Sequence, residues 1–301
     1  MASLKHWISA LRPRTLFLAV ASTICANGMA YSTGRFSVSI CILTMLTATF
    51  LQLLSNLAND LGDYQHGTDI TGHRVGPTRT VQSGAITPHQ MKIAISVAVF
   101  CSMLIGAALI YEASQFMNIG YMVLFLFLGA AAIWAAIKYT AGKNPYGYKG
   151  FGDIFSFIFF GPVAVVGTYF LHVHKMTFQP WLPAIGLGLF TAAVLNVNNM
   201  RDMDNDRNSG KMTLVIHLGL AKAKLYHSFL SIGGIACFIA YSLIYSSQWY
   251  SYLYMIFFIP FLIILRNIYK TEDNPLLDPY LKFTSLSAFV LSVAFAICIN
   301  I

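Results

Sequence analysis

The amino-acid sequence predicts an all-α membrane protein, a bundle of nine transmembrane helices with its N-terminus in the cytoplasm and its C-terminus outside. Three observations lead to this prediction. The 301 residues are 57% hydrophobic and only 10% charged, whereas soluble domains carry about 25% charged residues. Uncharged apolar runs recur along the whole chain. Basic residues gather in alternate connections between these runs.

The apolar runs predict the individual helices. A membrane-spanning helix needs roughly 20 apolar residues, and where a run is shorter its flanking residues can extend it. The runs are continuous, which excludes the alternating pattern of barrel strands, and lipid accepts only helices or closed barrels. A cleaved signal peptide would explain the first run alone. In chain order the nine runs are Leu16–Ser32, Phe36–Leu54, Ile93–Tyr111, Ile119–Ile137, Ile154–Leu171, Trp181–Leu195, Leu225–Tyr245, Tyr250–Leu265 and Phe283–Ile299.

The distribution of basic residues predicts the orientation. All but two of the 19 Lys and Arg residues, Arg35 and Lys175, fall on the side that also receives the N-terminus. The positive-inside rule places that side in the cytoplasm. The same asymmetry explains the net charge of +8, and because the charges are dispersed over loops we do not expect nucleic-acid binding.

The chain is expected to form one integral-membrane domain, residues 1–301, since no flexible linker interrupts it. The five cysteines all lie in apolar runs and form no CxxC pair, so they are predicted to pack as small hydrophobic residues rather than to bind metal. They are Cys25, Cys41, Cys101, Cys237 and Cys298.

Two acidic stretches follow apolar runs about 140 residues apart, on the predicted cytoplasmic side. The first, 59–69, reads NDLGDYQHGTD, and the second, 198–206, reads NNMRDMDND. In both, an Asn precedes an Asp by four residues, which places the two side chains on one helical face. The chain therefore looks like two weakly repeated halves, each with an acidic helix end.

Carboxylates at the edge of a membrane are costly unless they are compensated. Mg²⁺ would compensate them, because it prefers oxygen ligands and is often bound by one or two carboxylates together with substrate phosphates. The basic residues beside the stretches would grip such phosphates. Arg74, Arg79, Arg201, Arg207 and Lys211 flank the acidic residues, and Lys138, Lys143 and Lys149 lie in the loop between them. This combination predicts a substrate with a diphosphate head and an apolar tail, such as an isoprenoid diphosphate.

At these residues the sequence resembles the UbiA superfamily of intramembrane aromatic prenyltransferases. The family's two acidic motifs stand here as Asn59-Asp60-x-x-Asp63, with Asp69 further on, and Asp202-x-x-x-Asp206. The resemblance covers essentially the whole chain. It implies that Asp63, Asp69, Asp202 and Asp206 hold Mg²⁺, with Asn59 and Asn198 in support.

Further segments resemble the 1,4-dihydroxy-2-naphthoate polyprenyltransferase branch of menaquinone synthesis, among them RPRTL at 12–16, GPTRTVQSGAI at 76–86 and KYTAGKNPYGYKGFGD at 138–153. Asp153 departs from the Glu that this branch often has. The resemblance implies that Arg79, Lys149 and Arg201 grip the diphosphate, with Lys211 and Asn198 beside them, and that Tyr139 lies near the prenyl-transfer centre.

The implied reaction joins a polyprenyl group to 1,4-dihydroxy-2-naphthoate, releasing CO₂ and diphosphate and giving demethylmenaquinone. Tyr139, Tyr146 or Tyr148 could face the allylic cation through their rings. The acceptor's carboxylate needs a cationic partner. Arg12, Arg14 and Lys143 are candidates by position, and plain positive-inside topology is the alternative explanation for them.

Two other classes of function are alternatives. Within the superfamily, a 4-hydroxybenzoate polyprenyltransferase, then a homogentisate-type or haem-farnesylating enzyme, would share the acidic motifs. A cation-coupled transporter would instead place its carboxylates near the membrane midplane on interrupted helices, whereas these lie at the ends of spans. The sequence therefore favours a multi-pass enzyme of the cytoplasmic (plasma) membrane, the cell inner membrane, with its site on the cytoplasmic side.

Overall fold

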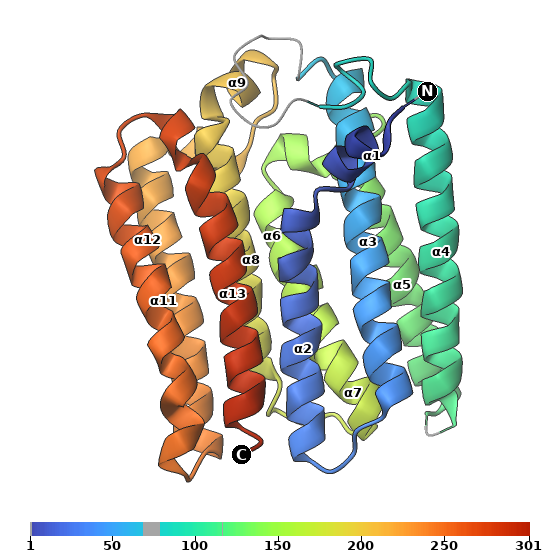
Figure 1. Cartoon of the computed structure of the whole chain (residues 1–301), viewed down its shortest axis with the longest axis vertical. Coiled ribbons are helices and arrows are strands. Elements are labelled where there is room, and N and C mark those ends of the chain that lie inside the picture. The colour runs from blue at the N-terminus through green and yellow to red at the C-terminus, as the bar shows by residue number, and fades with distance from the viewer. Residues whose placement is uncertain (1, 69–78, 116) are drawn as a thin grey trace.

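A computed structural model describes residues 2–68, 79–115 and 117–301, and these residues form helices joined by turns and loops, without a strand (Figure 1). Within them, nine helical segments are long and apolar enough to cross a membrane, as the sequence predicts. They are Leu4–Ser32, Val38–Gln65, Pro88–Ser114, Ile119–Lys138, Gly152–Val173, Trp181–Arg201, Leu220–Tyr245, Trp249–Lys270 and Asn274–Cys298.

Several of these segments combine more than one helix. The helices are α1 (Leu4–Leu11), η1 (Pro13–Thr15), α2 (Leu16–Ser32), α3 (Val38–Gln65), α4 (Pro88–Ser114), α5 (Ile119–Lys138), η2 (Tyr146–Lys149), α6 (Gly152–Ile158), η3 (Phe159–Val166), α7 (Gly167–Val173), α8 (Trp181–Arg201), α9 (Met203–Asn208), α10 (Leu214–Leu218), α11 (Leu220–Tyr245), η4 (Trp249–Phe258), α12 (Ile259–Lys270), η5 (Asn274–Leu277) and α13 (Asp278–Cys298). The short helices α1, α9 and α10 do not correspond to any helix predicted from the sequence.

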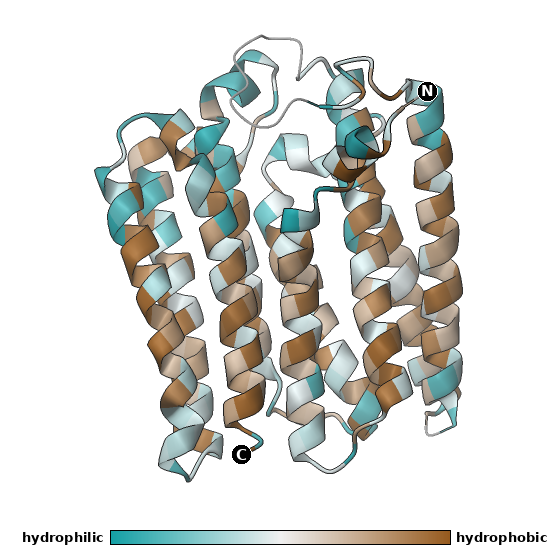
Figure 2. Ribbon diagram, in the orientation of Figure 1, coloured by the Kyte–Doolittle hydropathy of each residue, from teal (hydrophilic) through white to brown (hydrophobic). Residues whose placement is uncertain are grey.

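The two chain ends lie at opposite ends of the bundle (Figure 1). Hydrophilic residues gather at the end that carries α1 and α9, while hydrophobic residues dominate the long middle of the helices (Figure 2). The described residues of both acidic stretches lie at this polar end, because α3 and α8 both terminate there. The bundle thus brings the two stretches to the same side, although about 140 residues separate them.

The fifth span is not a regular α-helix. Its middle segment, η3, is a π-helix that contains Pro162. Proline lacks the backbone N–H and breaks the α-helical hydrogen-bond ladder, and π-helical insertions accommodate such interruptions, often at functional sites. Ser22 Oγ of α2 donates a hydrogen bond of 2.6 Å to the carbonyl of Phe160 in η3. This bond ties the irregular segment to the first span.

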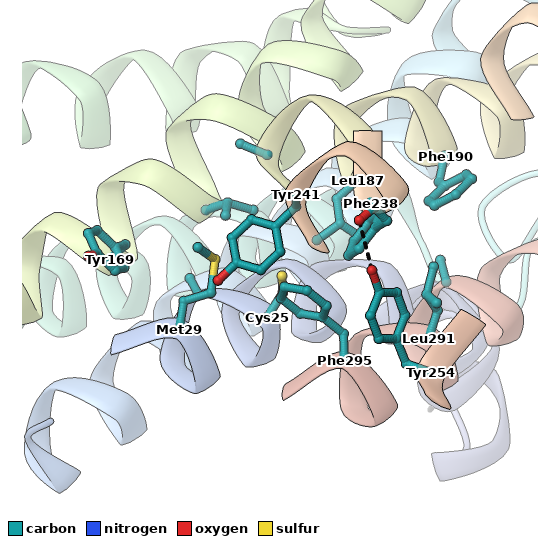
Figure 3. Packing of buried hydrophobic residues seen from close by; sticks show 14 of the residues in the cluster. Cys25, Met29, Tyr169, Leu187, Phe190, Phe238, Tyr241, Tyr254, Leu291 and Phe295 are labelled. Atoms are coloured by element: carbon teal, nitrogen blue, oxygen red, sulfur yellow. Dashed lines mark hydrogen bonds between the residues drawn. The ribbon is translucent and has the colours of Figure 1, made fainter. Parts of the chain in front are cut away.

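The core on the α11 side of the bundle is built on aromatic rings (Figure 3). Phe295 of α13 meets Phe238, Tyr241 and Tyr254 edge to face, with ring centroids 5.0–5.1 Å apart. This is the preferred geometry for aromatic pairs. The Tyr254 hydroxyl donates to the backbone carbonyl of Phe238 at 2.7 Å, so its polar end is satisfied inside the core. This core fixes α11, η4 and α13 as one side of the bundle.

Candidate active site

A cavity of about 1040 Å³ lies between α2, α3, α4, α5, α6, η3, α7, α8 and α13. Its lining along α3 runs from Asp63 at the polar end to Thr44, which is ~28 Å of helix at 1.5 Å per residue. Its polar end carries the acidic and basic side chains, and apolar side chains dominate the remainder. The cavity can therefore hold a molecule with a charged head and a long apolar body.

The apolar run predicted to end at Leu54 continues as helix, so the first acidic stretch begins inside α3. Helix α3 continues to Gln65, because Leu57, Ala58 and Leu61 remain buried on its inner side. Asn59, Asp60 and Asp63 thus belong to its last turns. Asp69 and Arg74 lie outside the residues that the structure describes.

Asp60 binds the segment that contains Thr80 and Val81. Its carboxylate accepts hydrogen bonds from the backbone N–H and hydroxyl of Thr80, at 3.1 and 2.9 Å, and from the N–H of Val81 at 3.1 Å. The side chain is 1% exposed. These three bonds position the residue next to Thr80, Arg79, in the cavity wall.

Asp63 is paired with a base and a phenol. The Arg79 guanidinium forms a buried ion pair and hydrogen bond with Asp63 Oδ2. The Tyr148 hydroxyl donates to Asp63 Oδ1 at 3.1 Å and also contacts the Thr68 hydroxyl. Burial, followed by the charge of Asp63, raises the pKa of Tyr148, so the phenol keeps the proton that it donates.

Arg201 grips the second stretch at the end of α8. Its Nε and one terminal nitrogen donate to the two Asp202 oxygens at 2.8 and 2.6 Å, the bidentate geometry that carboxylates favour. The same guanidinium donates to Asp278 of α13 at 2.6 Å and to Asn198 at 3.0 Å. Arg201 therefore connects α8 and α13 across the mouth of the cavity.

Asp206 and Lys211 form the second ion pair of this stretch. Lys211 Nζ lies 3.4 Å from Asp206 Oδ2, and both residues are buried. Burial raises the pKa of Asp206, Lys211 opposes the rise, and the charges of Asp202 and Asp63 add to it, so that the pKa lies at about 6. Burial alone would lower the pKa of Lys211, but the attraction of Asp206 and then Asp63 outweighs burial and raises it.

Lys211 and Asn205 connect the two stretches. Lys211 Nζ lies 5.7 Å from the centre of the Tyr148 ring, which itself bonds Asp63. Asn205 Nδ2 donates to the carbonyl of Thr68, three residues beyond Gln65 at the end of α3, at 3.1 Å. The structure thus joins the acidic ends of both halves into one charged site.

Tyr139 lines the cavity just past the end of α5. Its ring packs against Gly147, where an added Cβ would lie 2.6 Å from Tyr139 Cε2. The next residue, Thr140, donates to Asn59 Oδ1 at 3.0 Å. The backbone of Thr140 can approach so closely because Gly62 of α3 faces it, and a Cβ there would lie 2.7 Å from the Thr140 carbonyl carbon.

The remaining predicted residues divide into two groups. Arg12 and Arg14 line the cavity, as do Asn59, Asn198 and Tyr146. Lys143 and Lys149 are exposed and lie outside the lining. Tyr148 and the buried Asp153 also lie outside it. The structure therefore brings most, but not all, of the predicted residues to one cavity.

The carboxylates of this site are suitable ligands for a cation that also binds phosphate. Among the described residues, no three His, Cys, Asp or Glu side chains form a group able to hold a metal alone. Mg²⁺ needs no such group, because one or two carboxylates and substrate phosphates are enough. Lys211 Nζ lies 3.4 Å from the buried Asp206 Oδ2, which makes no hydrogen bond to a described residue. A cation bound at this carboxylate would therefore free Lys211 for the phosphate.

The sequence did not reveal several supporting contacts. Thr80 bonds Asp60, Asn205 of the second stretch bonds the carbonyl of Thr68, and Tyr148, predicted only as a possible partner of the allylic cation, bonds Asp63. Helical spacing did indicate that Asp60 has a different role, because Asn59 and Asp63 share a helical face on which Asp60 does not lie. Its partner could not be found, because that partner depends on the path of the loop.

Comparisons with known proteins agree with this geometry. A sequence model of the UbiA prenyltransferase family matches residues 19–287. The 1,4-dihydroxy-2-naphthoate octaprenyltransferase of Haemophilus influenzae is 38% identical over 296 residues, 98% of this chain and 95% of that protein. The Escherichia coli protein of the same name is 38% identical over 292 residues, 97% of this chain and 94% of its own length.

A solved structure is similar in fold. The structure of a UbiA homologue from Archaeoglobus fulgidus, bound to GPP and Mg²⁺, superposes with a TM-score of 0.64. The alignment covers 96% of this chain and 99% of that one, at 15% sequence identity. At this identity the likeness concerns the fold alone, an all-helical multi-pass membrane bundle.

Proposed function

We infer the function of this chain from the premise that it belongs to the UbiA prenyltransferase family. We propose that it transfers a polyprenyl group from a polyprenyl diphosphate to 1,4-dihydroxy-2-naphthoate, releasing diphosphate and CO₂. The product is the prenylated dihydroxynaphthalene that becomes demethylmenaquinone on oxidation. Two relatives that match nearly the whole chain carry the name of this activity.

One observation carries the proposal: buried acidic and basic side chains from both halves meet at the polar end of a mainly apolar cavity. The charged end suits a diphosphate with its cation. The apolar lining along α3 suits a prenyl chain. Since burying charged groups in a membrane protein is costly, such a mixture is expected where a charged substrate compensates it.

Mg²⁺ is the cation that we propose for this site. Asp63, Asp202 and Asp206 would hold it, with Asp69 as a further candidate, and Asn59 and Asn198 lie beside them in the cavity wall. The related Archaeoglobus fulgidus structure contains GPP and Mg²⁺. When bound, Mg²⁺ supplies positive charge that stabilises the departing diphosphate.

The protein's own cations take part in the same step. Arg79, Arg201 and Lys211 line the cavity beside the three carboxylates and would bind the diphosphate oxygens as Mg²⁺ occupies the carboxylates. Lys149 is exposed, and its predicted contact with the diphosphate would require the side chain to reach over the rim. These positive groups favour cleavage of the bond between the allylic carbon and the diphosphate oxygen, with the electron pair leaving on oxygen.

The allylic carbon then becomes positively charged and is attacked by the electron-rich ring. A new C–C bond forms, and the electrons of the ring–carboxylate bond return to the ring as CO₂ departs. The ring faces of Tyr139 and Tyr146, whose centroids lie 5.5 Å apart at the cavity wall, would stabilise the cation. The apolar lining excludes water, which would otherwise capture the cation. Arg12 and Arg14 are placed to attract the acceptor's carboxylate.

The orientation forms part of the proposal. Hydrophilic residues gather at the end of the bundle that bears the acidic stretches (Figure 2), and the connections on this side contain all but two of the Lys and Arg residues. We therefore place this end in the cytoplasm and the chain in the cytoplasmic membrane.

The acceptor is tested by supplying membranes that contain the protein with Mg²⁺, a polyprenyl diphosphate and either of two acids. We expect prenylation with 1,4-dihydroxy-2-naphthoate and none with 4-hydroxybenzoate. Turnover of 4-hydroxybenzoate alone would reject the naphthoate assignment and leave the family membership intact. Absence of product with both acids would reject the proposed transferase activity and favour a cation-coupled transporter.

A further inference from the structure

A hydrogen-bonded network of amides and a hydroxyl joins η1 to α3 within the cavity wall. Asn56 Nδ2 donates to the Leu11 carbonyl at 2.8 Å and to Thr15 Oγ1 at 2.9 Å. Gln52 Nε2 donates to Asn56 Oδ1 at 3.1 Å and to Thr15 Oγ1 at 3.3 Å. Thr15 Oγ1 donates in turn to the Arg12 carbonyl at 3.0 Å.

The chemistry of the partners fixes both amide orientations. The Leu11 carbonyl can only accept, so the Asn56 atom that faces it must be the NH₂ group. Asn56 Oδ1 can then only accept, and the Gln52 atom beside it must also be the NH₂ group. The Thr15 hydroxyl donates once and accepts twice, which exhausts its capacity.

One acceptor of this network remains unused. Among the described residues, none donates to Gln52 Oε1, while Gln52 itself lines the cavity. A carbonyl oxygen in an apolar, membrane-embedded cavity costs free energy unless a donor reaches it. The fixed amide thus presents a single acceptor to whatever occupies the cavity.

Gln52 lies at the depth where the acceptor ring should bind. It follows Asn56, Asn59 and Asp63 down one face of α3 and is ~16 Å from Asp63 along the helix axis. The diphosphate occupies the Asp63 end in the proposed function, so the reacting carbon and the ring lie between the two residues. Arg12 and Arg14, next to the same network, line the cavity at this level.

We propose that Gln52 is a specificity-determining residue whose Oε1 accepts a hydrogen bond from the 4-hydroxyl of the dihydroxynaphthoate. This inference rests on the proposed function. The 1-hydroxyl is adjacent to the carboxylate and is satisfied by it internally. The 4-hydroxyl has no such neighbour and needs an acceptor from the protein, and Gln52 Oε1 is an acceptor without a donor.

The test compares two ligands on one substitution, Gln52→Met, which keeps the side chain's length and removes its polar atoms. The first measurement is the KM for 1,4-dihydroxy-2-naphthoate. The second is the inhibition constant of 1-hydroxy-2-naphthoate, which lacks the 4-hydroxyl. Loss of the Gln52 NH₂ group also breaks two bonds of the network, which affects both ligands alike. We therefore expect the KM to rise about tenfold more than the inhibition constant, the value of one buried hydrogen bond.

Thr15→Val serves as the control, because it breaks the same network and leaves Gln52 Oε1 in place. We expect it to shift both constants by a similar factor. If Gln52→Met also shifts both equally, or shifts neither, the inference is overturned. The wild-type protein is assayed first, so failure of the proposed function would appear there as absence of turnover with dihydroxynaphthoate.

Discussion

Asn205 of α9 donates a 3.1 Å hydrogen bond from its side chain to the backbone carbonyl of Thr68, which lies 137 residues earlier in the chain. Both residues are buried. The bond joins the segment after α3 to the segment after α8, and each of these helices ends in one of the two acidic stretches. The two halves of the charged site are therefore fixed to each other directly and do not depend on the substrate alone to bring them together.

Replacement of Asn205 by alanine should loosen the site. The Thr68 carbonyl would lose its partner, at a cost of about 1–3 kcal/mol in the free energy of unfolding. We expect a lower midpoint of thermal unfolding in detergent and at least tenfold slower turnover. Asn208→Ala, on the exposed side of the same helix, is the matched control and should behave as wild type. Equal effects of the two substitutions would show that the bond to Thr68 is unimportant.

Asp60→Asn should be severely damaging, although we do not place Asp60 at the metal. An amide has one acceptor oxygen, so it would turn its NH₂ group towards a donor of Thr80 or Val81, and at least one of three hydrogen bonds would be lost. We expect about 1–3 kcal/mol of destabilisation and a raised KM for the prenyl diphosphate, since Arg79 would be misplaced. Asp204→Asn, at an exposed acid of the second stretch, should change neither. A wild-type KM in Asp60→Asn would refute the positioning role.

Mg²⁺ binding should weaken as the pH falls through about 6. Burial raises the pKa of Asp206 to about 6, so below this pH the carboxyl is neutral and the cation must displace a proton. Above it the carboxylate is charged and available. The apparent Kd for Mg²⁺ is expected to rise by about tenfold for each pH unit below the pKa. Calorimetric titration at several pH values in wild type and in Asp206→Asn measures this. The same slope in both proteins would exclude Asp206 as its source.

Gly147→Ala should slow the chemical step. The new Cβ would lie 2.6 Å from the Tyr139 ring and from the Tyr139 carbonyl oxygen, so the ring must move away from the cavity wall. A displacement of about 1 Å can cost about 100-fold in rate, and we expect kcat to fall while the KM for prenyl diphosphate changes little. Gly233→Ala in α11 is the control, since its nearest neighbour is a Leu189 methyl at 3.1 Å that can rotate. An unchanged kcat in Gly147→Ala would remove Tyr139 from the reacting centre.

The sequence predicted the nine spans because hydrocarbon imposes a length and polarity that can be read residue by residue. It also predicted that two acidic stretches would meet, because both follow spans that end on the same side. The contacts inside the site could not be predicted in the same way. Whether Asp60 faces the metal or Thr80 depends on the path of the loop that leads to Thr80. Whether Tyr148 of η2 reaches Asp63 depends on how closely α3 approaches the end of α5, at Gly62 and Thr140.

The π-helix in the fifth span also depends on contacts that the local sequence does not specify. Pro162 signals an interruption, but its form depends on contacts such as the one from Ser22. Helix α1 was missed for a related reason. It has only eight residues and packs at the polar end, where neither spanning length nor continuous hydrophobicity is required. Local patterns thus predict the long elements, whereas the site depends on contacts between segments far apart in the chain.

The central claim is that one site, built from both acidic stretches, couples Mg²⁺-assisted loss of diphosphate to decarboxylation of a dihydroxynaphthoate. The most direct measurement follows the purified protein with a polyprenyl diphosphate and acceptor labelled in its carboxyl group, and quantifies CO₂ and diphosphate together. We predict equal amounts of both products, none after Mg²⁺ is chelated, and nearly none in Asp63→Ala or Asp202→Ala, although both variants still insert into membranes. Wild-type rates in these variants, or diphosphate release without CO₂, would contradict the claim.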